Sequence, residues 1–124
     1  VSNPDDVKAL LSQTEEELGP ITDLVNSAAL ATGIGPIEDL DIEQTRRMLE
    51  INVFGLFICC HCAVRRMARR RGGQGGTIIN LSSAAARTHA SGPLWTIQPA
   101  RRRSIASPKA WRRNKDPRAS VFSA

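Results

Sequence analysis

The stretch "GGTIINLSSAAA", residues 75–86, decides the fold predicted for this chain of 124 residues. Residues 77–81 are β-branched or apolar except for Asn80, as expected of a parallel strand that is covered on both faces. Two serines follow the strand directly. Because open α/β sheets bind ligands at the carboxyl ends of their strands, Ser83 is expected at a ligand-binding edge.

The residues before this strand predict a helix, a short strand and a long helix. Residues 1–20 form an amphipathic helix that Ser2 can cap and that Gly19 and Pro20 end. Residues 21–30, "ITDLVNSAAL", form the short strand, and the long helix runs from Asp41 to the glycines at 72 and 73. Alternating strands and long helices predict an α/β fold: part of a doubly wound, Rossmann-like parallel sheet in three α/β/α layers.

The long helix is expected to turn one apolar stripe inward. Asn52 lies on the buried side of this helix, where its amide must find a hydrogen-bond partner. On its own, this position predicts a satisfied structural amide. The stripe consists of Ile42, Leu49, Val53, Leu56, Phe57, Cys60, Val64 and Met67.

Cysteine usage and hydropathy exclude several classes of protein. Cys59, Cys60 and Cys62 are too close together on one helix to surround a zinc ion or to form the disulfide framework of a secreted domain, so no metal site is predicted. The longest apolar run, residues 53–64, is shorter than the roughly 18 residues that span a bilayer. We expect a cytoplasmic protein with no membrane segment and no signal peptide.

The charge changes sign along the chain. Residues 1–94 contain nine basic and eleven acidic side chains, whereas residues 95–124 contain eight basic side chains and one acid. Prolines recur at 93, 99, 108 and 117 in this tail, and no apolar period is visible. The sequence therefore predicts an ordered domain over residues 1–92 and a basic, disordered tail over residues 93–124.

Three motifs in residues 1–90 together resemble the short-chain dehydrogenase/reductase family. The family's strand-end motif N-N-A-G appears as Asn26, Ser27, Ala28 and Ala29, its helix motif N-x-x-G appears as Asn52 with Gly55, and "INLSSAAA" matches its serine-bearing strand. The resemblance implies a central fragment of an NAD(P)-dependent oxidoreductase that moves hydride between an alcohol and a ketone or aldehyde. It also implies that Ser83 orients the substrate, that Asn52 holds a water in a proton relay, and that Asn26 and Ala28 line the NAD or NADP.

The chain departs from the family in two places. It contains no tyrosine, the residue that donates the proton in the family, and no glycine-rich turn for the dinucleotide pyrophosphate. Read one base out of register, however, the codons of residues 95–101 permit V-D-Y-S-A-S-K, which contains the family's Y-x-x-x-K, and residues 119–122 permit the family's G-I-R-V. We therefore interpret residues 93–124 as out-of-frame translation, and we expect the chain as written to be inactive.

An alternative function is nucleic-acid binding by the tail, where arginines stand beside Trp95 and Trp111. Because a basic, proline-rich run is more often simply solvated, nucleic acid is the less favoured partner. The intact family member is expected to bind a small alcohol or carbonyl substrate and to form a homo-oligomer. The substrate and the choice between NAD and NADP depend on residues that the sequence does not show.

Overall fold

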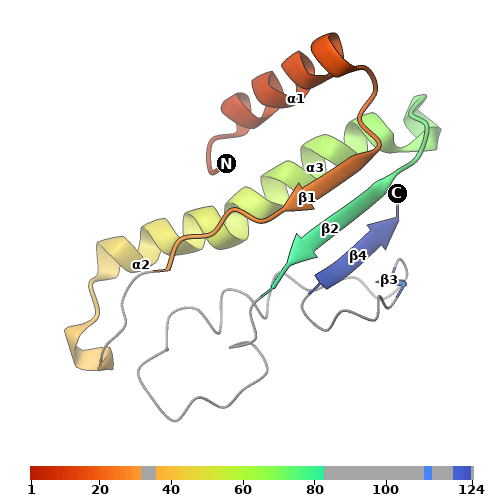
Figure 1. The fold of residues 1–124 in the computed structure, drawn as a ribbon. Helices are drawn as coiled ribbons and strands as arrows, with labels where there is room; N and C mark the ends of the chain where they lie inside the picture. Colours follow the sequence, from red (N-terminus) through yellow and green to blue (C-terminus); the bar gives the residue numbers. More distant parts are fainter. Residues whose placement is uncertain (32–35, 83–110, 113–118, 124) are drawn as a thin grey trace.

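A computed structural model describes residues 1–31, 36–82, 111–112 and 119–123 of the chain (Figure 1). In chain order the elements are α1 (Pro4–Leu18), β1 (Asp23–Asn26), η1 (Ile37–Asp39), α2 (Ile42–Leu49), η2 (Glu50–Gly55), α3 (Leu56–Met67), η3 (Arg69–Arg71), β2 (Thr77–Leu81), β3 (Trp111–Arg112) and β4 (Ala119–Ser123). The predicted order of helix, strand, long helix and strand is confirmed.

The sheet has four strands in the order β1-β2-β4-β3. Strands β1 and β2 pair in parallel, with Asp23 opposite Thr77 and Asn26 opposite Asn80, so both strands end at the same edge (Figure 1). This pair is the parallel unit that the sequence predicts. A parallel pair needs a crossover helix, and the long helix between the strands supplies it.

Strands β3 and β4 differ from the expectation of a tail without regular structure. β4 pairs antiparallel with β2 along its whole length, and β3 pairs antiparallel with β4. The physical reason is that β2 has a second edge whose backbone N–H and C=O groups need partners, which no other described segment provides. The sheet is therefore mixed rather than purely parallel.

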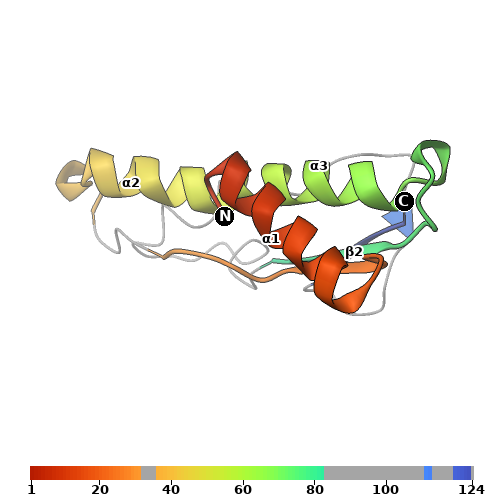
Figure 2. The same cartoon turned by 90° about the horizontal axis from the view of Figure 1, so that it is seen from above.

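Elements α2, η2 and α3 run as one long rod along one side of the sheet (Figure 2). Its middle six residues, η2, are wound as a π-helix, a local widening that the sequence pattern did not predict. The inward stripe also differs from the prediction, because Ile42, Leu49 and Phe57 are exposed, while Met48, Asn52, Cys62 and Ala63 are buried. The widening can rotate only the turns that follow it, so it bears on Phe57 and not on Ile42 or Leu49.

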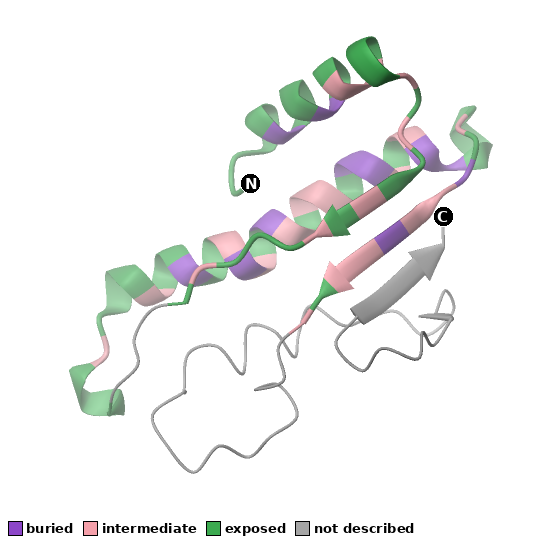
Figure 3. Cartoon of the chain, in the orientation of Figure 1, coloured by how far each residue is buried: buried purple, intermediate pink, exposed green. Residues whose placement is uncertain are grey.

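The core of the described residues lies between this rod and its two neighbours (Figure 3). Ala63 and Met67 of α3 pack on Ile78 in the middle of β2. Cys62, on another side of α3, packs against Val7 and Leu11 of α1. Thus α3 is covered by both α1 and the sheet, and only one face of the sheet is covered by a helix in the described part of the chain.

Helix α1 begins and ends as its sequence suggests, with one correction. The side chain of Asn3, not of Ser2, caps it by accepting a hydrogen bond from the Asp5 N–H at 2.8 Å. Gly19 follows the helix with φ +88°, a conformation that favours glycine. Leu10 and Leu18, which the helical period puts on the same face as Val7 and Leu11, are exposed, because only Val7 and Leu11 of α1 are buried in the apolar contact with α3.

An arginine joins α1 to α3. Arg66 Nε donates to Glu15 Oε2 at 2.9 Å, and the same guanidinium donates to Ser12 Oγ at 2.9 Å and to the Lys8 carbonyl at 3.3 Å. Both side chains of the ion pair are largely buried. This clamp fixes the angle between the two helices, and it was not predicted because Glu15 and Arg66 both lie in runs of like charge.

By length and composition alone, the helical rod Ile42–Met67 would suffice to cross a bilayer. In this structure one side of the rod packs on the sheet and on α1. These contacts account for the buried apolar side chains of α3, while Ile42, Leu49, Phe54 and Phe57 are exposed.

Candidate functional site

The carboxyl ends of β1 and β2 are joined by two asparagine side chains. Asn26 ends β1, and its Nδ2 donates to Oδ1 of Asn80 on β2 at 2.7 Å. Their backbones are register partners, and both side chains point to the α3 side of the sheet, where Leu24 and Ile78 also pack. An amide pair at this place satisfies two polar groups that would otherwise be costly to bury.

A thiol of α3 completes this cluster. Asn26 Nδ2 also lies 3.4 Å from Cys60 Sγ, and Cys60 Sγ lies 3.7 Å from Asn80 Oδ1. Burial raises the pKa of Cys60, while its hydrogen bonds with the two amides act in the opposite direction. The thiol is therefore protonated at neutral pH, which lets it donate to Asn80. Sequence reasoning treated Cys60 only as an apolar core residue.

Asn52 lies in the π-helical segment and clamps the chain that leaves β1. Its Oδ1 accepts from the Leu30 N–H at 2.8 Å, and its Nδ2 donates to the Leu30 carbonyl at 2.7 Å. Its exposed fraction is 7%, so both polar atoms of the side chain are used and little water reaches them. The structural amide that the sequence suggested is therefore present. π-Helical turns inside α-helices often occur at functional sites, because they shift backbone carbonyls away from their usual partners.

The remaining predicted site residues are Ala28 and Ser83. Ala28 is exposed in the segment between Asn26 and Leu30. Ser83 lies outside the described residues, which end in this region at Ser82. The structure thus brings Asn26 and Asn52 to one edge of the sheet, together with the strand that precedes Ser83.

Ser82 is a residue that sequence reasoning passed over. Its hydroxyl oxygen is buried and has no hydrogen-bond partner, which is rare for a buried polar atom. The repeated serine in "LSS" was the only sequence feature that pointed to it. An orphaned hydroxyl at the carboxyl edge of a parallel strand pair fits a polar ligand there, such as the part of a dinucleotide that reaches this edge.

No trio of histidine, cysteine or acidic side chains in the described ranges is arranged to hold a metal ion. Cys59, Cys60 and Cys62 are free thiols that belong to different surroundings. Cys60 faces the asparagine pair, whereas Cys59 and Cys62 pack with Val7 and Leu11. The adjacent cysteines therefore do not point to a common centre.

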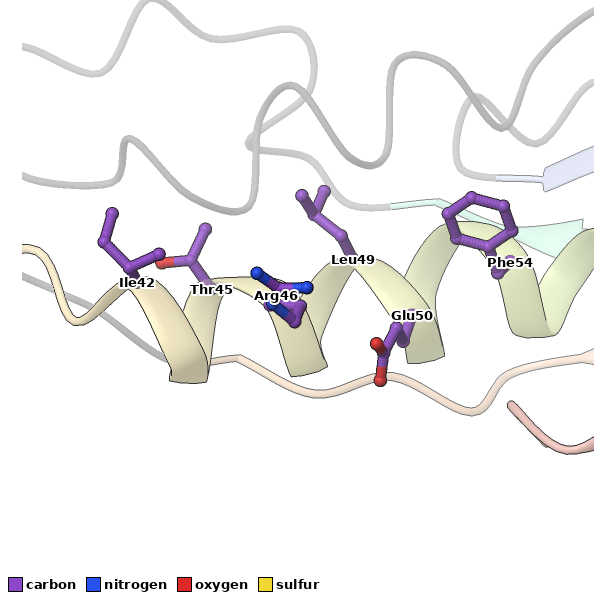
Figure 4. A pocket seen from close by; sticks show the side chains of 6 residues that line it. All are labelled: Ile42, Thr45, Arg46, Leu49, Glu50 and Phe54. Carbon is purple, nitrogen blue, oxygen red and sulfur yellow. The ribbon is translucent and has the colours of Figure 1, made fainter.

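A pocket of about 370 Å³ lies along α2 and is lined by Ile42, Thr45, Arg46, Leu49, Glu50 and Phe54 (Figure 4). None of these residues belongs to the edge formed by Asn26, Asn80 and Ser82. Its lining mixes three apolar side chains with Thr45, Arg46 and Glu50, and it includes none of the predicted site residues, so it is a poor candidate for the site of chemistry.

Comparison with known proteins gives a consistent result. The model of the short chain dehydrogenase family matches residues 1–95. The uncharacterized oxidoreductase YgfF of Escherichia coli is 38% identical over 92 residues, which are 74% of this chain and 37% of that protein. The NADP-dependent (R)-specific alcohol dehydrogenase of Lentilactobacillus kefiri is 38% identical over 74 residues, which are 60% of this chain and 28% of that enzyme.

A solved structure agrees. A short-chain type dehydrogenase/reductase from Mycobacterium marinum superposes with a TM-score of 0.73 and 27% identity, over 82% of this chain and 40% of that one. The chain therefore spans well under half the length of the proteins that it matches.

Proposed function

The chain belongs to the short-chain dehydrogenase family of oxidoreductases, and on this basis we propose that it carries part of a site for NAD(P)-dependent hydride transfer between an alcohol and a ketone or aldehyde. The observation that carries this proposal is the meeting of Asn26, Asn52 and the end of β2 at one carboxyl edge. These residues come from three separate motifs of the sequence. The parallel pairing brings the ends of β1 and β2 together, and Asn52 is joined to them through the backbone of Leu30, four residues beyond Asn26.

Each site residue has a proposed role. Ser83 orients the carbonyl of the substrate by a hydrogen bond, and the neighbouring Ser82 hydroxyl is available to the same ligands. Ala28 lines the cofactor, since it is exposed beside the end of β1. Asn26 supports the segment that carries Ala28, because its side-chain amide is bound to Asn80 and Cys60.

Asn52 supports the proton relay through its backbone. Its Oδ1 and Nδ2 each bind the backbone of Leu30, so we propose that a water of the relay would be held by a carbonyl of the π-helical segment. The cofactor, when bound, supplies or accepts the hydride. NAD and NADP are both compatible with the described residues; the similar enzyme of Lentilactobacillus kefiri is named as NADP-dependent.

We propose that the 124 residues as written do not turn over substrate. They contain no tyrosine to donate the proton and no glycine-rich turn to hold the pyrophosphate. A frame change between about residues 88 and 95 accounts for the missing tyrosine, and the end of the family match at residue 95 is in keeping with it.

Two measurements test these proposals. Sequencing the coding DNA should show codons for residues 95–101 that encode Y-x-x-x-K in the neighbouring frame; codons that forbid this reading would exclude the frame change. Titration of the 124-residue chain with NADH, followed by cofactor fluorescence, should show no saturable binding in the micromolar range. Micromolar binding together with alcohol oxidation would disprove the proposed inactivity.

The catalytic role of Ser83 has its own test. A protein that keeps residues 1–92, reads the following DNA in the neighbouring frame and carries a family glycine-rich segment before residue 1 should show NAD(P)H-dependent carbonyl reduction, and Ser83→Ala in that protein should lower kcat by about 100-fold or more. Ser2→Ala, at an exposed serine before α1, is the matched control and should retain kcat. Equal activity of the Ser83 variant would remove Ser83 from the site.

Self-association is part of the same proposal. The helical rod exposes Ile42, Leu49, Phe54 and Phe57, whose exposed fractions run from 39% to 64%. Several exposed apolar side chains on one helical rod favour a protein contact. Sedimentation should give a mass above that of one chain, and Phe54→Glu should reduce it to the monomer.

A further inference from the structure

Cys60 occupies an unusual position among the three thiols. It is the residue of α3 that reaches the asparagine pair, with Sγ 3.4 Å from Asn26 Nδ2 and 3.7 Å from Asn80 Oδ1. The three side chains come from α3, β1 and β2, and they are 34, 54 and 20 positions apart in the sequence. The cluster therefore ties together the three elements that form the carboxyl edge.

The directions of these hydrogen bonds are mutually dependent. Asn26 Nδ2 donates to both Asn80 Oδ1 and the sulfur, and the thiol S–H donates to Asn80 Oδ1. If the Asn26 amide were rotated by 180°, its oxygen would face the Asn80 oxygen. If the Asn80 amide were rotated instead, its nitrogen would face the Asn26 nitrogen. A thiol can donate and accept at once, so it fits the space between one amide nitrogen and one amide oxygen.

We propose that Cys60 is a positioning residue, whose thiol fixes the orientation of the Asn26 and Asn80 amides and thereby the relative position of the ends of β1 and β2. The part of this inference that concerns an active site rests on the proposed function, since these ends precede Ala28 and Ser83. The part that concerns the amides rests on the geometry alone.

The neighbouring cysteine provides the contrast. Cys59 is also half-buried and carries the same thiol, but it packs with the apolar side chains of Val7 and Leu11. In the described part of the structure no amide is bound to it. A change at Cys59 therefore perturbs packing of a similar thiol on the same helix and leaves the amide cluster intact.

The test is nuclear magnetic resonance of the full 124-residue chain, with the side-chain NH₂ groups of Asn26 and Asn80 assigned. Cys60→Val, which replaces the thiol by methyl groups and removes the donor, should shift both NH₂ resonances and speed exchange of the Asn26 amide protons with water about fivefold, the effect of losing one weak hydrogen bond. Cys60→Ser should restore both, because a hydroxyl donates and accepts. Cys59→Val is the matched control and should change neither.

Several outcomes would overturn the proposal. They are unchanged amide resonances in Cys60→Val, equal shifts in Cys59→Val, or failure of Cys60→Ser to restore the wild-type pattern. If Cys60→Val does not fold, amide exchange in the wild-type protein still tests the proposal. An Asn26 side-chain amide that exchanges with water as fast as a solvent-exposed amide contradicts the cluster. None of these readouts needs cofactor, so their failure is distinct from absent NADH binding, which bears on the proposed function.

Discussion

Replacement of Asn52 by alanine should lower the free energy of unfolding by about 2 kcal/mol. The side chain makes two hydrogen bonds to Leu30, of 2.8 and 2.7 Å, from a position that is 7% exposed. A hydrogen bond contributes about 1–1.5 kcal/mol net, and loss of the amide leaves the Leu30 N–H and C=O without partners. Leu30 is only half-buried, so water partly replaces the amide, and alanine regains about 0.5 kcal/mol as a better helix former.

Urea denaturation followed by circular dichroism measures this change. With a slope of about 2 kcal/mol per molar urea, a loss of 2 kcal/mol lowers the midpoint by about 1 M. Glu50→Ala is the matched control, because it makes a substitution to alanine in the same π-helical segment at an exposed side chain. Its midpoint should fall by less than half as much. Equal shifts for the two variants, or no shift for Asn52→Ala, would refute the clamp.

Three further predictions concern other contacts. Arg66→Met should lower the unfolding free energy by roughly 1–2 kcal/mol in the same assay, because it removes the largely buried ion pair with Glu15; a variant as stable as wild type would contradict the clamp between the helices. Gly76→Ala should lower the melting temperature by several degrees, because its Cβ would collide with the Thr22 carbonyl oxygen. An unchanged melting temperature would show that residue 76 and the Thr22 carbonyl leave room for a methyl group. Burial raises the pKa of the Cys60 thiol, so stability is full below the unfolded value near 9.0 and is lost as pH rises through the folded pKa; a pH series should show this fall, and Cys60→Ser should lessen it.

Much of residues 1–82 could be predicted from local patterns. The apolar run before Ser82 gave β2, and the acidic start and glycine end gave α1. The asparagines at 26 and 52 were singled out because they match family motifs, and Asn52 also because an amide inside an apolar helix face must find a partner. These inferences hold because each depends on residues within a few turns or one strand.

The hydrogen-bond and packing partners of those residues could not be predicted from the sequence. By its pattern Cys60 was predicted to be an apolar core residue, and Ser82 was passed over in favour of the neighbouring Ser83. Nothing local distinguishes a thiol that meets two amides from one that meets leucine, as the contrast between Cys60 and Cys59 shows. Likewise, the helical period placed Leu10 inward, but α1 contacts α3 along a narrower line.

The sequence by itself determined the order of helices and strands and the family to which the chain is similar, because periodicity, caps and motifs act over short distances. The tertiary structure decided which polar groups meet: Asn26 with Asn80 across 54 positions, and Asn52 with the Leu30 backbone across 22. Those pairings follow from strand register and from the π-helical widening of one helix. Both are set by packing between elements that are distant in the chain, which no local pattern encodes.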